Sequence, residues 1–444
     1  MLPGGKSTKT SRFEPIENPR KISLNSTASS STPLPSSPSK SIQEKQNDDI
    51  PLDTSFSSSP SASATIIARN EDLLTQILLK LPPKSLLRFQ CVSKQWLSLI
   101  SDPVFRRRHS SSIRCYPTTD FLFFSSDSFR NEINLLSFSG DGVDSVGNVS
   151  SPLRYSLEGE ILSLQSCNGL LCIQFMVNDI SRELIVYNPT TCKHRSIPWP
   201  YAESIPLVIR YTNIAFDPVK SDYYKLVCVG VDLNGTFYRF LVYSSEAGVW
   251  SVSRDALGMD SGSAYYFGKG VLWNGDVHFL GSDCCTLCFD IENECLQPST
   301  PRIPTNLEVV GRWDIRYFGE TGGNLYVICL NKPKAMLFDV FALKRDYSQW
   351  VVKYRVDFAP LITYYPEMKN RGFHTPCFVV DKEGKKARIV ISVEDKFIYY
   401  DIHGMFVKEL VEVVPVYAEV GGWRDSTWYR WYEAYQHVDT LASV

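Results

Sequence analysis

A short aromatic phrase recurs five times within residues 111–444 of this 444-residue chain. In each copy an aromatic residue stands between an apolar and a polar neighbour; the aromatic positions are Tyr187, Tyr243, Phe289, Phe338 and Tyr400. Successive copies lie 56, 46, 49 and 62 residues apart. After a polar turn, the last four are followed by Trp250, Leu296, Trp350 and Val407. The pattern predicts an outer hairpin, in which one strand ends near the aromatic residue and the next strand runs back.

The period of this phrase constrains the fold of residues 111–444. Short runs rich in β-branched and aromatic residues alternate with turn signals such as Asn168-Gly169, Asn274-Gly275 and Gly322-Gly323-Asn324, and helical periodicity is nearly absent. Two hairpins in about 50 residues make a four-stranded propeller blade, and such blades bury both faces only by stacking around a ring. We therefore predict an all-β propeller of roughly six or seven blades. A pair of β-sandwiches is the alternative.

Residues 1–63 have the composition of a disordered tail. Seventeen of them are serine and eight are proline, so little apolar surface can be buried to offset the entropy of ordering. A solvated spacer is the simplest interpretation. A plastid transit peptide is the alternative, because the first 40 residues carry six Lys or Arg but only Glu14 and Glu17 as acids. The prolines in this stretch oppose the helix that a transit peptide forms.

Residues 64–110 predict a small all-α unit, which makes the chain an α+β multidomain protein. Asn70 is an N-cap before the acidic first turn, and leucine and isoleucine recur at helical spacing up to Pro82-Pro83. Further short helices are expected over residues 84–90, after Ser93 and after Asp102-Pro103. A core of this size is marginal, so we expect some leucines to face either a partner or the next domain. The basic run at residues 106–109 is predicted to be the solvated end of the last helix.

These segments closely resemble two parts of a known protein family. The run DLLTQILLKLPPKSLLRF at residues 72–89, CVSKQW at 91–96 and LISDPVF at 99–105 resemble the F-box of many plant proteins. SCNGLLC at residues 166–172, YNPTT at 187–191 and FDP at 216–218 resemble the kelch-like, F-box-associated propeller of the same proteins. The resemblance covers about residues 68–440 and leaves the tail outside. One departure is Arg69-Asn70, where the family usually has Leu-Pro.

The resemblance implies a role as the non-catalytic substrate receptor of a Skp–cullin–F-box ubiquitin ligase. The F-box would bind the Skp-type adaptor, and through it a cullin scaffold, while the propeller binds a target protein. The positions that the resemblance assigns to adaptor docking or to the F-box core are Leu73, Ile77, Leu81, Pro82, Leu86, Val92 and Trp96. An interaction scaffold that acts without the ligase is the alternative, because the altered opening at Arg69-Asn70 can weaken docking.

Aromatic loops are the candidate target-binding sites, because tryptophan, tyrosine and arginine dominate protein-binding hot spots. The candidates are Trp313, Tyr365, Trp423, Trp428 and Trp431. The last three belong to a segment with three tryptophans in ten residues. Its alternative interpretation is that these rings close the last blade against the first.

Enzymatic, metal and nucleic-acid functions have little support in the residues. Phosphate loops, zinc-protease motifs and nucleophile elbows are absent from the sequence. Cys284, Cys285, Cys288 and Cys295 lie near His278 and suggest a zinc site, but buried reduced thiols are the simpler interpretation. We therefore expect no catalytic residue, no cofactor and no metal. The net charge of −2 favours neither nucleic acid nor a membrane. Scattered cysteines without an export signal predict a place in the cytosol or nucleus.

Overall fold

The computed structural model describes residues 21–22, 70–113, 121–126, 131–139, 142–148, 160–177, 181–200, 207–259, 265, 267–305, 315–332, 336–370, 373–380, 387–393, 396–402, 406–413, 418–420, 423–425, 428–429 and 435–444. Of the predicted disordered tail, only β1 (Lys21–Ile22) is described. It pairs in parallel with Glu412 and Val413 of β24. The rest of residues 1–63 lies outside the described residues.

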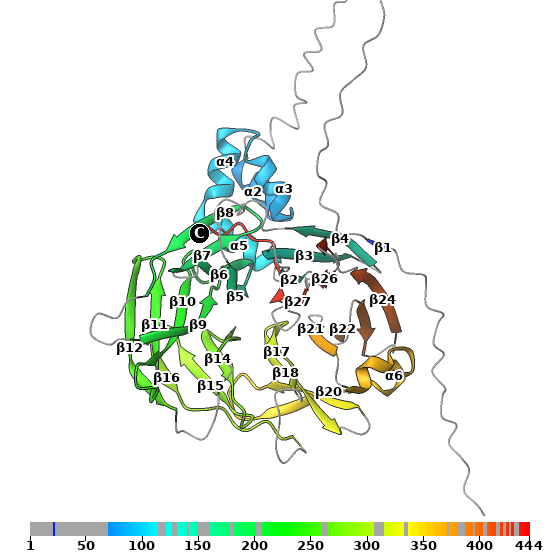
Figure 1. Ribbon diagram of the computed structural model, residues 1–444. Helices are drawn as coiled ribbons and strands as arrows, with labels where there is room; N and C mark the ends of the chain where they lie inside the picture. The colour runs from blue at the N-terminus through cyan, green and yellow to red at the C-terminus, as the bar shows by residue number, and fades with distance from the viewer. Residues whose placement is uncertain are drawn as a thin grey trace, which may run out of the picture.

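Four helices form a helical module over residues 70–113. They are α2 (Glu71–Leu78), α3 (Pro83–Phe89), α4 (Lys94–Ser101) and α5 (Pro103–Ile113). The predicted caps are confirmed, because the side chains of Asn70 and Ser93 accept hydrogen bonds from the backbone N–H groups of Leu73 and Trp96, at 3.1 and 3.2 Å. Each cap satisfies a donor that a helix start otherwise leaves without a partner. The module lies against one side of the β-domain (Figure 1).

The remaining chain is a ring of sheets around a central axis, as Figure 1 shows, so the predicted propeller is confirmed and the pair of sandwiches is wrong. Five blades consist of four consecutive strands each. They are β5 (Glu160–Cys167), β6 (Leu170–Val177), β7 (Ser181–Asn188) and β8 (Lys193–Ile197); β9 (Leu207–Ala215), β10 (Lys225–Asp232), β11 (Phe237–Ser244) and β12 (Val249–Gly258); β13 (Val271–Trp273), β14 (Asp276–Leu280), β15 (Thr286–Asp290) and β16 (Cys295–Gln297); β17 (Ile315–Thr321), β18 (Asn324–Lys332), β19 (Leu337–Leu343) and β20 (Trp350–Asp357); and β21 (Phe373–Val380), β22 (Ala387–Val393), β23 (Lys396–Asp401) and β24 (Phe406–Val413). Five such blades are fewer than the six or seven predicted.

A composite sheet joins the two ends of the β-domain. Its core is β2 (Phe121–Ser126), β3 (Asn131–Ser139) and β4 (Gly142–Asn148), and β2 also pairs with β27 (Trp428–Tyr429) and β28 (Tyr435–Gln436). This sheet lies between the blades β21–β24 and β5–β8 in Figure 1. The first described strand of the domain is therefore held by two of its last strands. A further hairpin, β25 (Ala418–Val420) with β26 (Trp423–Asp425), precedes β27.

The five aromatic residues of the recurring phrase all lie on the third strand of a blade, in the outer hairpin that was predicted, but one of them does not occupy the expected position within its strand. Tyr243, Phe289 and Tyr400 each lie opposite the residue expected on the fourth strand, which is Trp250, Leu296 or Val407. Trp350, however, lies opposite Leu343 at the end of β19, whereas Phe338 lies near the start of that strand. The choice of Phe338 was therefore wrong. With Leu343 in its place the spacings become 56, 46, 54 and 57 residues, which is a more regular repeat.

The two tryptophans of this repeat also bind the preceding blade. The indole Nε1 of Trp250 donates to the carbonyl oxygen of Pro198, which follows β8, at 2.8 Å. The indole Nε1 of Trp350 donates to the carbonyl oxygen of Pro301, which follows β16, at 3.0 Å. Each tryptophan thus connects its outer strand to the neighbour around the ring.

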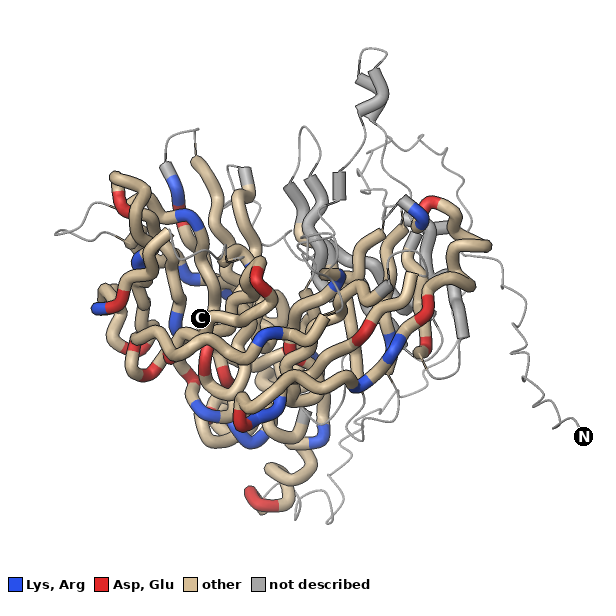
Figure 2. Tube along the Cα trace, turned by 90° about the horizontal axis from the view of Figure 1, so that it is seen from below, with Lys and Arg blue, Asp and Glu red and all other residues tan. Residues whose placement is uncertain are grey.

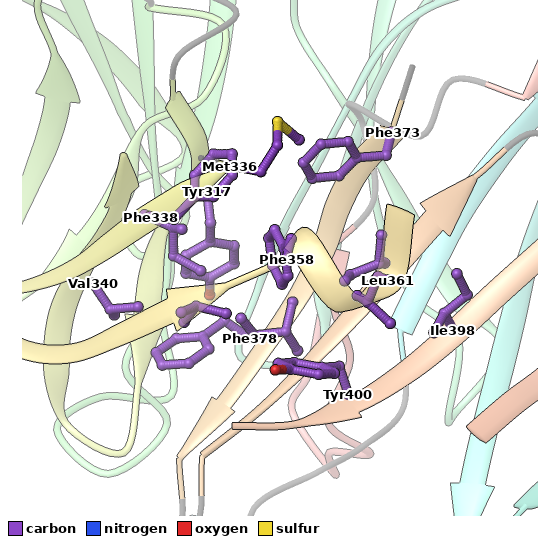
Figure 3. Packing of buried hydrophobic residues seen from close by; sticks show 14 of the residues in the cluster. Tyr317, Met336, Phe338, Val340, Phe358, Leu361, Phe373, Phe378, Ile398 and Tyr400 are labelled. Carbon is purple, nitrogen blue, oxygen red and sulfur yellow. The ribbon is translucent and has the colours of Figure 1, made fainter. Parts of the chain in front are cut away.

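The hydrophobic core of the propeller lies between blades. The largest cluster joins β17–β20 to β21–β24 around Phe338, Phe358, Phe373 and Phe378 (Figure 3). The short helix α6 (Ala359–Tyr364) and the 3₁₀ turn η4 (Pro366–Asn370) connect these blades and contribute Leu361 and Met368 to the same cluster. Similar clusters fill the other interfaces that the structure describes. Blades that share their cores in this way cannot fold independently.

Candidate functional site

The helical module buries one set of apolar side chains and leaves another set exposed. On the buried face, Leu74, Leu78, Leu86, Ile100 and Phe105 are at most 2% exposed. They come from all four helices and form one cluster, which is completed by Leu441 from the C-terminus of the chain. The module therefore has a core of its own, although a small one.

Large aliphatic side chains also cover the outside of the module. We call this set the exposed stripe: Leu73, Ile77, Val92, Leu97 and Val104, which are 42 to 59% exposed. Leu73 and Ile77 are four residues apart on α2, so they share one face of that helix. The module thus leaves five large aliphatic side chains outside, whereas it buries four aliphatic side chains and one phenylalanine from its own sequence. Such a surface is typical of a protein interface.

The seven residues expected to dock an adaptor or to form the core divide between these two faces. Leu73, Ile77, Pro82 and Val92 are exposed, whereas Leu86 is fully buried. Leu81 and Trp96 are half-buried and pack against the cluster. The Trp96 ring meets Phe89 edge to face, with 5.4 Å between the ring centroids. Sequence reasoning left Leu97 and Val104 out of the site, although their helical positions were apparent; their exposure depends on how α4 and α5 pack.

The basic run at the end of the module was predicted to be the solvated end of the last helix, and this prediction is wrong. Arg106 and Arg107 reach Asp222 of the β9–β10 loop, with N···O distances of 3.7 and 2.6 Å. His109 is buried, and its Nε2 lies 2.8 Å from the carbonyl oxygen of Leu81. Burial lowers the pKa of His109, and the contact with Leu81 only partly opposes this effect. Arg106 and Arg107 thus fasten α5 to the propeller, and His109 contacts Leu81, just after the end of α2, inside the module. Of the four basic residues only Arg108 is exposed.

Comparisons with known proteins agree with this geometry. The F-box domain model matches residues 70–108, and the F-box associated beta propeller domain model matches residues 112–319. F-box protein At5g07610 of Arabidopsis thaliana is 30% identical over 412 residues, which are 86% of this chain and 94% of that protein. The chain belongs to the F-box protein family. The helical module is its F-box.

Other relatives of this F-box protein bear kelch-repeat names. The Arabidopsis thaliana F-box/kelch-repeat protein At3g22730 is 25% identical over 355 residues, or 74% of this chain and 89% of that protein. Among solved structures, TolB from Acinetobacter baumannii aligns with a TM-score of 0.38 at 8% identity and covers 71% of this chain and 65% of that chain. That likeness is too weak to support any argument about function.

The residues expected to contact a target have different positions. Tyr365 was predicted to contact a target, but the residue is only 5% exposed. It belongs to the core cluster between the last two blades, where it is not available to a partner. Trp428 lies in β27, whose backbone pairs with β2. Trp423 lies in β26. Trp313 and Trp431 lie outside the described residues.

The cysteines near His278 are packed in the blade β13–β16 and its surroundings. Cys284 and Cys285 precede β15 in a turn, and burial raises the pKa of both thiols. Burial also raises the pKa of Cys288, which lies directly opposite His278 in the sheet. Burial lowers the pKa of His278 to about 4. Protonated thiols are poor nucleophiles and poor metal ligands. Within the described residues, no group of three or more His, Cys, Asp or Glu side chains is arranged to hold a metal ion.

Over the described blades seen in Figure 2, positive and negative charges are mixed, because Lys and Arg are interspersed with Asp and Glu. A nucleic-acid site would instead present a basic surface. Among the described residues, no helix has the length and apolar composition that crossing a membrane requires.

Proposed function

We propose that this protein is a non-catalytic substrate receptor of a Skp–cullin–F-box ubiquitin ligase. In this role the exposed stripe binds the Skp-type adaptor, the adaptor connects to a cullin, and the propeller binds the target protein. F-box proteins are in general adaptors of this kind, and the pairing of an F-box with a propeller supports the assignment. No catalytic residue is assigned.

One observation carries the proposal: the exposed stripe remains uncovered although the F-box already packs on the propeller. Leu441 completes the buried cluster and does not cover the exposed stripe. Covering a half-exposed Leu, Ile or Val contributes about 1 kcal/mol, so five such residues make a sufficient nucleus for binding. A helix face with aliphatic residues at this spacing is suited to an apolar groove on a partner.

The test uses charged substitutions on the exposed stripe. Ile77→Asp and Val92→Asp should leave the F-box folded, because both side chains are about half exposed, and should weaken binding to a recombinant Skp-type adaptor by about tenfold or more. Leu233→Asp is the matched control, because Leu233 is 68% exposed on a turn of the propeller. Unchanged adaptor affinity in both F-box variants, measured by calorimetry, would remove the exposed stripe from the proposal.

For the target, the propeller tryptophans remain the candidates. The proposed target-binding surface includes or lies near four of them: Trp313, Trp423, Trp428 and Trp431. Tyr365 is no longer a candidate, because it is buried. Crosslinking from each tryptophan position in cells treated with a proteasome inhibitor tests this assignment. A target captured equally well by alanine variants at all four positions contradicts it.

A second function, as a scaffold without ligase assembly, is favoured by the start of α2. Where the family usually has an apolar Leu-Pro, the side chain of Asn70 caps the helix through Leu73. A scaffold would recover partners but no cullin in affinity purification. Either role is proposed to take place in the cytosol or nucleus, which imaging of a fluorescent fusion will test.

A further inference from the structure

The last ten residues of the chain run from the propeller to the F-box. This C-terminal segment, residues 435–444, begins with β28, which pairs with β2 in the composite sheet. It then crosses the end of the blade β5–β8, and it finishes beside the F-box, where the C-terminus is marked in Figure 1. Leu441 and Thr440 are buried although they are near the end of the chain.

The blade β5–β8 holds the backbone of the C-terminal segment. The Asn188 side chain is fully buried, and its amide donates to the carbonyl oxygens of Thr440 and Ala442, at 3.1 and 2.8 Å. Thr190 Oγ1 accepts a hydrogen bond from the Thr440 backbone N–H at 3.2 Å. At Gly169, whose φ is +90°, an added Cβ would lie 2.3 Å from the carbonyl oxygen of Val438. The segment therefore lies in a fitted track on the blade.

The same segment enters the F-box. Leu441 is 7% exposed and belongs to the cluster of Leu74, Leu78, Leu86, Ile100 and Phe105. Ser443 accepts a hydrogen bond from Arg106 on α5. One side chain of the propeller's own C-terminal segment thus completes the core of another domain.

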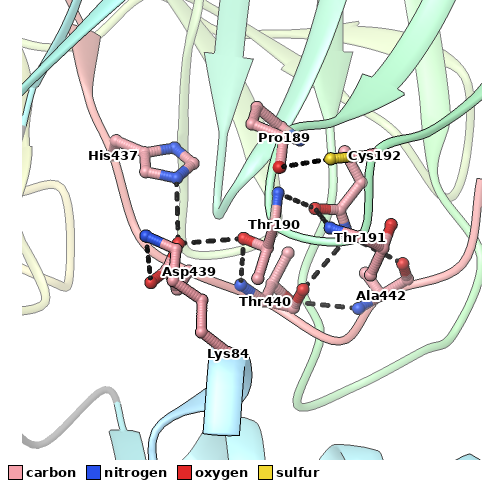
Figure 4. Close-up of polar contacts among 10 residues, drawn as sticks. Lys84, Pro189, Thr190, Thr191, Cys192, His437, Asp439, Thr440 and Ala442 are labelled. Carbon is pink, nitrogen blue, oxygen red and sulfur yellow. Dashed lines mark hydrogen bonds and ion pairs between the residues drawn. The ribbon is translucent and has the colours of Figure 1, made fainter. Parts of the chain in front are cut away.

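Asp439 connects the two domains through a single carboxylate, as Figure 4 shows. Its Oδ1 accepts a hydrogen bond from Thr190 of the propeller at 3.0 Å and lies 3.5 Å from His437 Nε2. Its Oδ2 lies 3.1 Å from the Lys84 ammonium at the start of α3. The carboxylate is only 24% exposed, so water screens this pairing less than it would on the surface.

We infer that Asp439 and Leu441 are positioning residues, which set the orientation of the F-box on the propeller and hence the direction in which a bound target faces the ligase. The part of this inference that concerns how a bound target faces the ligase rests on the proposed function. Besides the C-terminal segment, the pairing of Arg106 and Arg107 with Asp222 attaches the F-box to the propeller at a second place. A joint held at one point can rotate about it, whereas two separated attachments suppress rotation.

The first experiment compares amide hydrogen exchange and small-angle scattering of the full chain with those of Leu441→Ala. The variant should raise the exchange rates of α2 and α3 by about tenfold or more, since local opening follows the loss of core contacts, and should broaden the distance distribution. Leu343→Ala is the matched control: it removes a buried leucine from β19, across the ring from the F-box (Figure 1), and should leave α2 and α3 protected. Unchanged exchange and scattering in Leu441→Ala would overturn the inference.

A second variant separates orientation from folding. Lys84→Met combined with Asp439→Asn leaves every cluster residue in place but breaks the carboxylate bridge. In a ligase reconstituted with the Skp-type adaptor, cullin and ubiquitin enzymes, mass spectrometry maps which propeller lysines become modified. The wild-type chain should give a restricted set of lysines, and the double variant a broader one at equal adaptor affinity. The same set in both proteins rejects the positioning role, whereas a wild-type chain that does not bind the adaptor rejects the proposed function instead.

Discussion

The F-box and the propeller bury their apolar residues in opposite ways. The largest propeller cluster contains 22 buried residues from two blades. The F-box cluster contains six, and one of these, Leu441, comes from the far end of the chain. The F-box nevertheless leaves five large aliphatic side chains about half exposed. The propeller exposes large hydrophobic side chains too, but the much smaller F-box carries five of the sixteen in the described residues. Relative to its size, the F-box therefore leaves more apolar surface without a partner inside this chain.

The largest expected effect is in the propeller core. Phe378→Ala removes a fully buried ring that meets Tyr317 and Tyr326 edge to face. We expect the free energy of unfolding to fall by about 4 kcal/mol, because the cavity lies between two blades that share it. Urea denaturation followed by tryptophan fluorescence measures the loss. A change below about 1 kcal/mol would show that this interface relaxes, unlike a close-packed core.

A neighbouring pair on α2 sharpens the contrast inside the F-box. Leu78→Ala truncates a side chain with 0% exposure, and it should lower the free energy of unfolding of the F-box by about 3 kcal/mol. Ile77→Ala, one residue earlier and 48% exposed, should change stability by no more than about 0.5 kcal/mol. Under the proposed function, in which Ile77 contacts the adaptor directly, the order should reverse for adaptor affinity in calorimetry. If both variants lose stability equally, the two faces are not distinct.

Acid should affect the two regions in different pH ranges. His278 in the propeller has its pKa lowered by burial to about 4, so it stabilises the fold only while neutral, and this contribution is lost as the pH falls from about 6.5 to 4. Burial raises the pKa of Asp439, but hydrogen bonding to His437 and the charge of Lys84 outweigh it and hold the pKa at about 2. Because that pKa is depressed, its contribution is present above about pH 4 and is lost as the pH falls toward 2.

The contribution should be about 3 kcal/mol for His278 and about 2 kcal/mol for Asp439. Urea denaturation at pH 7, 4 and 2 measures them, with His278→Phe and Asp439→Asn as the variants. His278→Phe should flatten the loss between pH 7 and 4, whereas Asp439→Asn should flatten only the loss below pH 4. If neither variant changes the profile, other groups govern acid unfolding.

The smallest expected effect concerns the track that the propeller offers to the C-terminal segment. Gly169→Ala places a methyl group on a residue with positive φ and against Val438 and Thr440. We expect a loss of about 1 to 2 kcal/mol from strain and displacement. Gly235→Ala has a positive φ but open space around it, so it reports the strain alone. Equal losses in thermal denaturation would show that the C-terminal segment adds nothing at this position.

Local signals accounted for much of the fold. The caps at Asn70 and Ser93 and the turn at Asn168-Gly169 depend on residues within a few positions of one another, and positive φ values at Asn168 and Gly169 confirm the turn. The predictions failed where contacts between residues far apart in the sequence determine the structure. Phe338 and Leu343 both follow an apolar residue on β19, and only the pairing with Trp350 shows which one occupies the repeat position. Tyr365 looked like a loop aromatic, but the helix α6 folds it into the core.

The sequence alone determined the two domain types, because helical periodicity and a repeat of about 50 residues are properties of neighbouring residues. Only the tertiary structure decided which leucines stay outside the F-box, and that Leu441 lies inside it while Asp439 bridges to Lys84. Hydrophobic burial has no direction along the chain, so Leu441, which is 336 to 367 positions away from the other residues of the cluster, can complete that core as well as a near neighbour can.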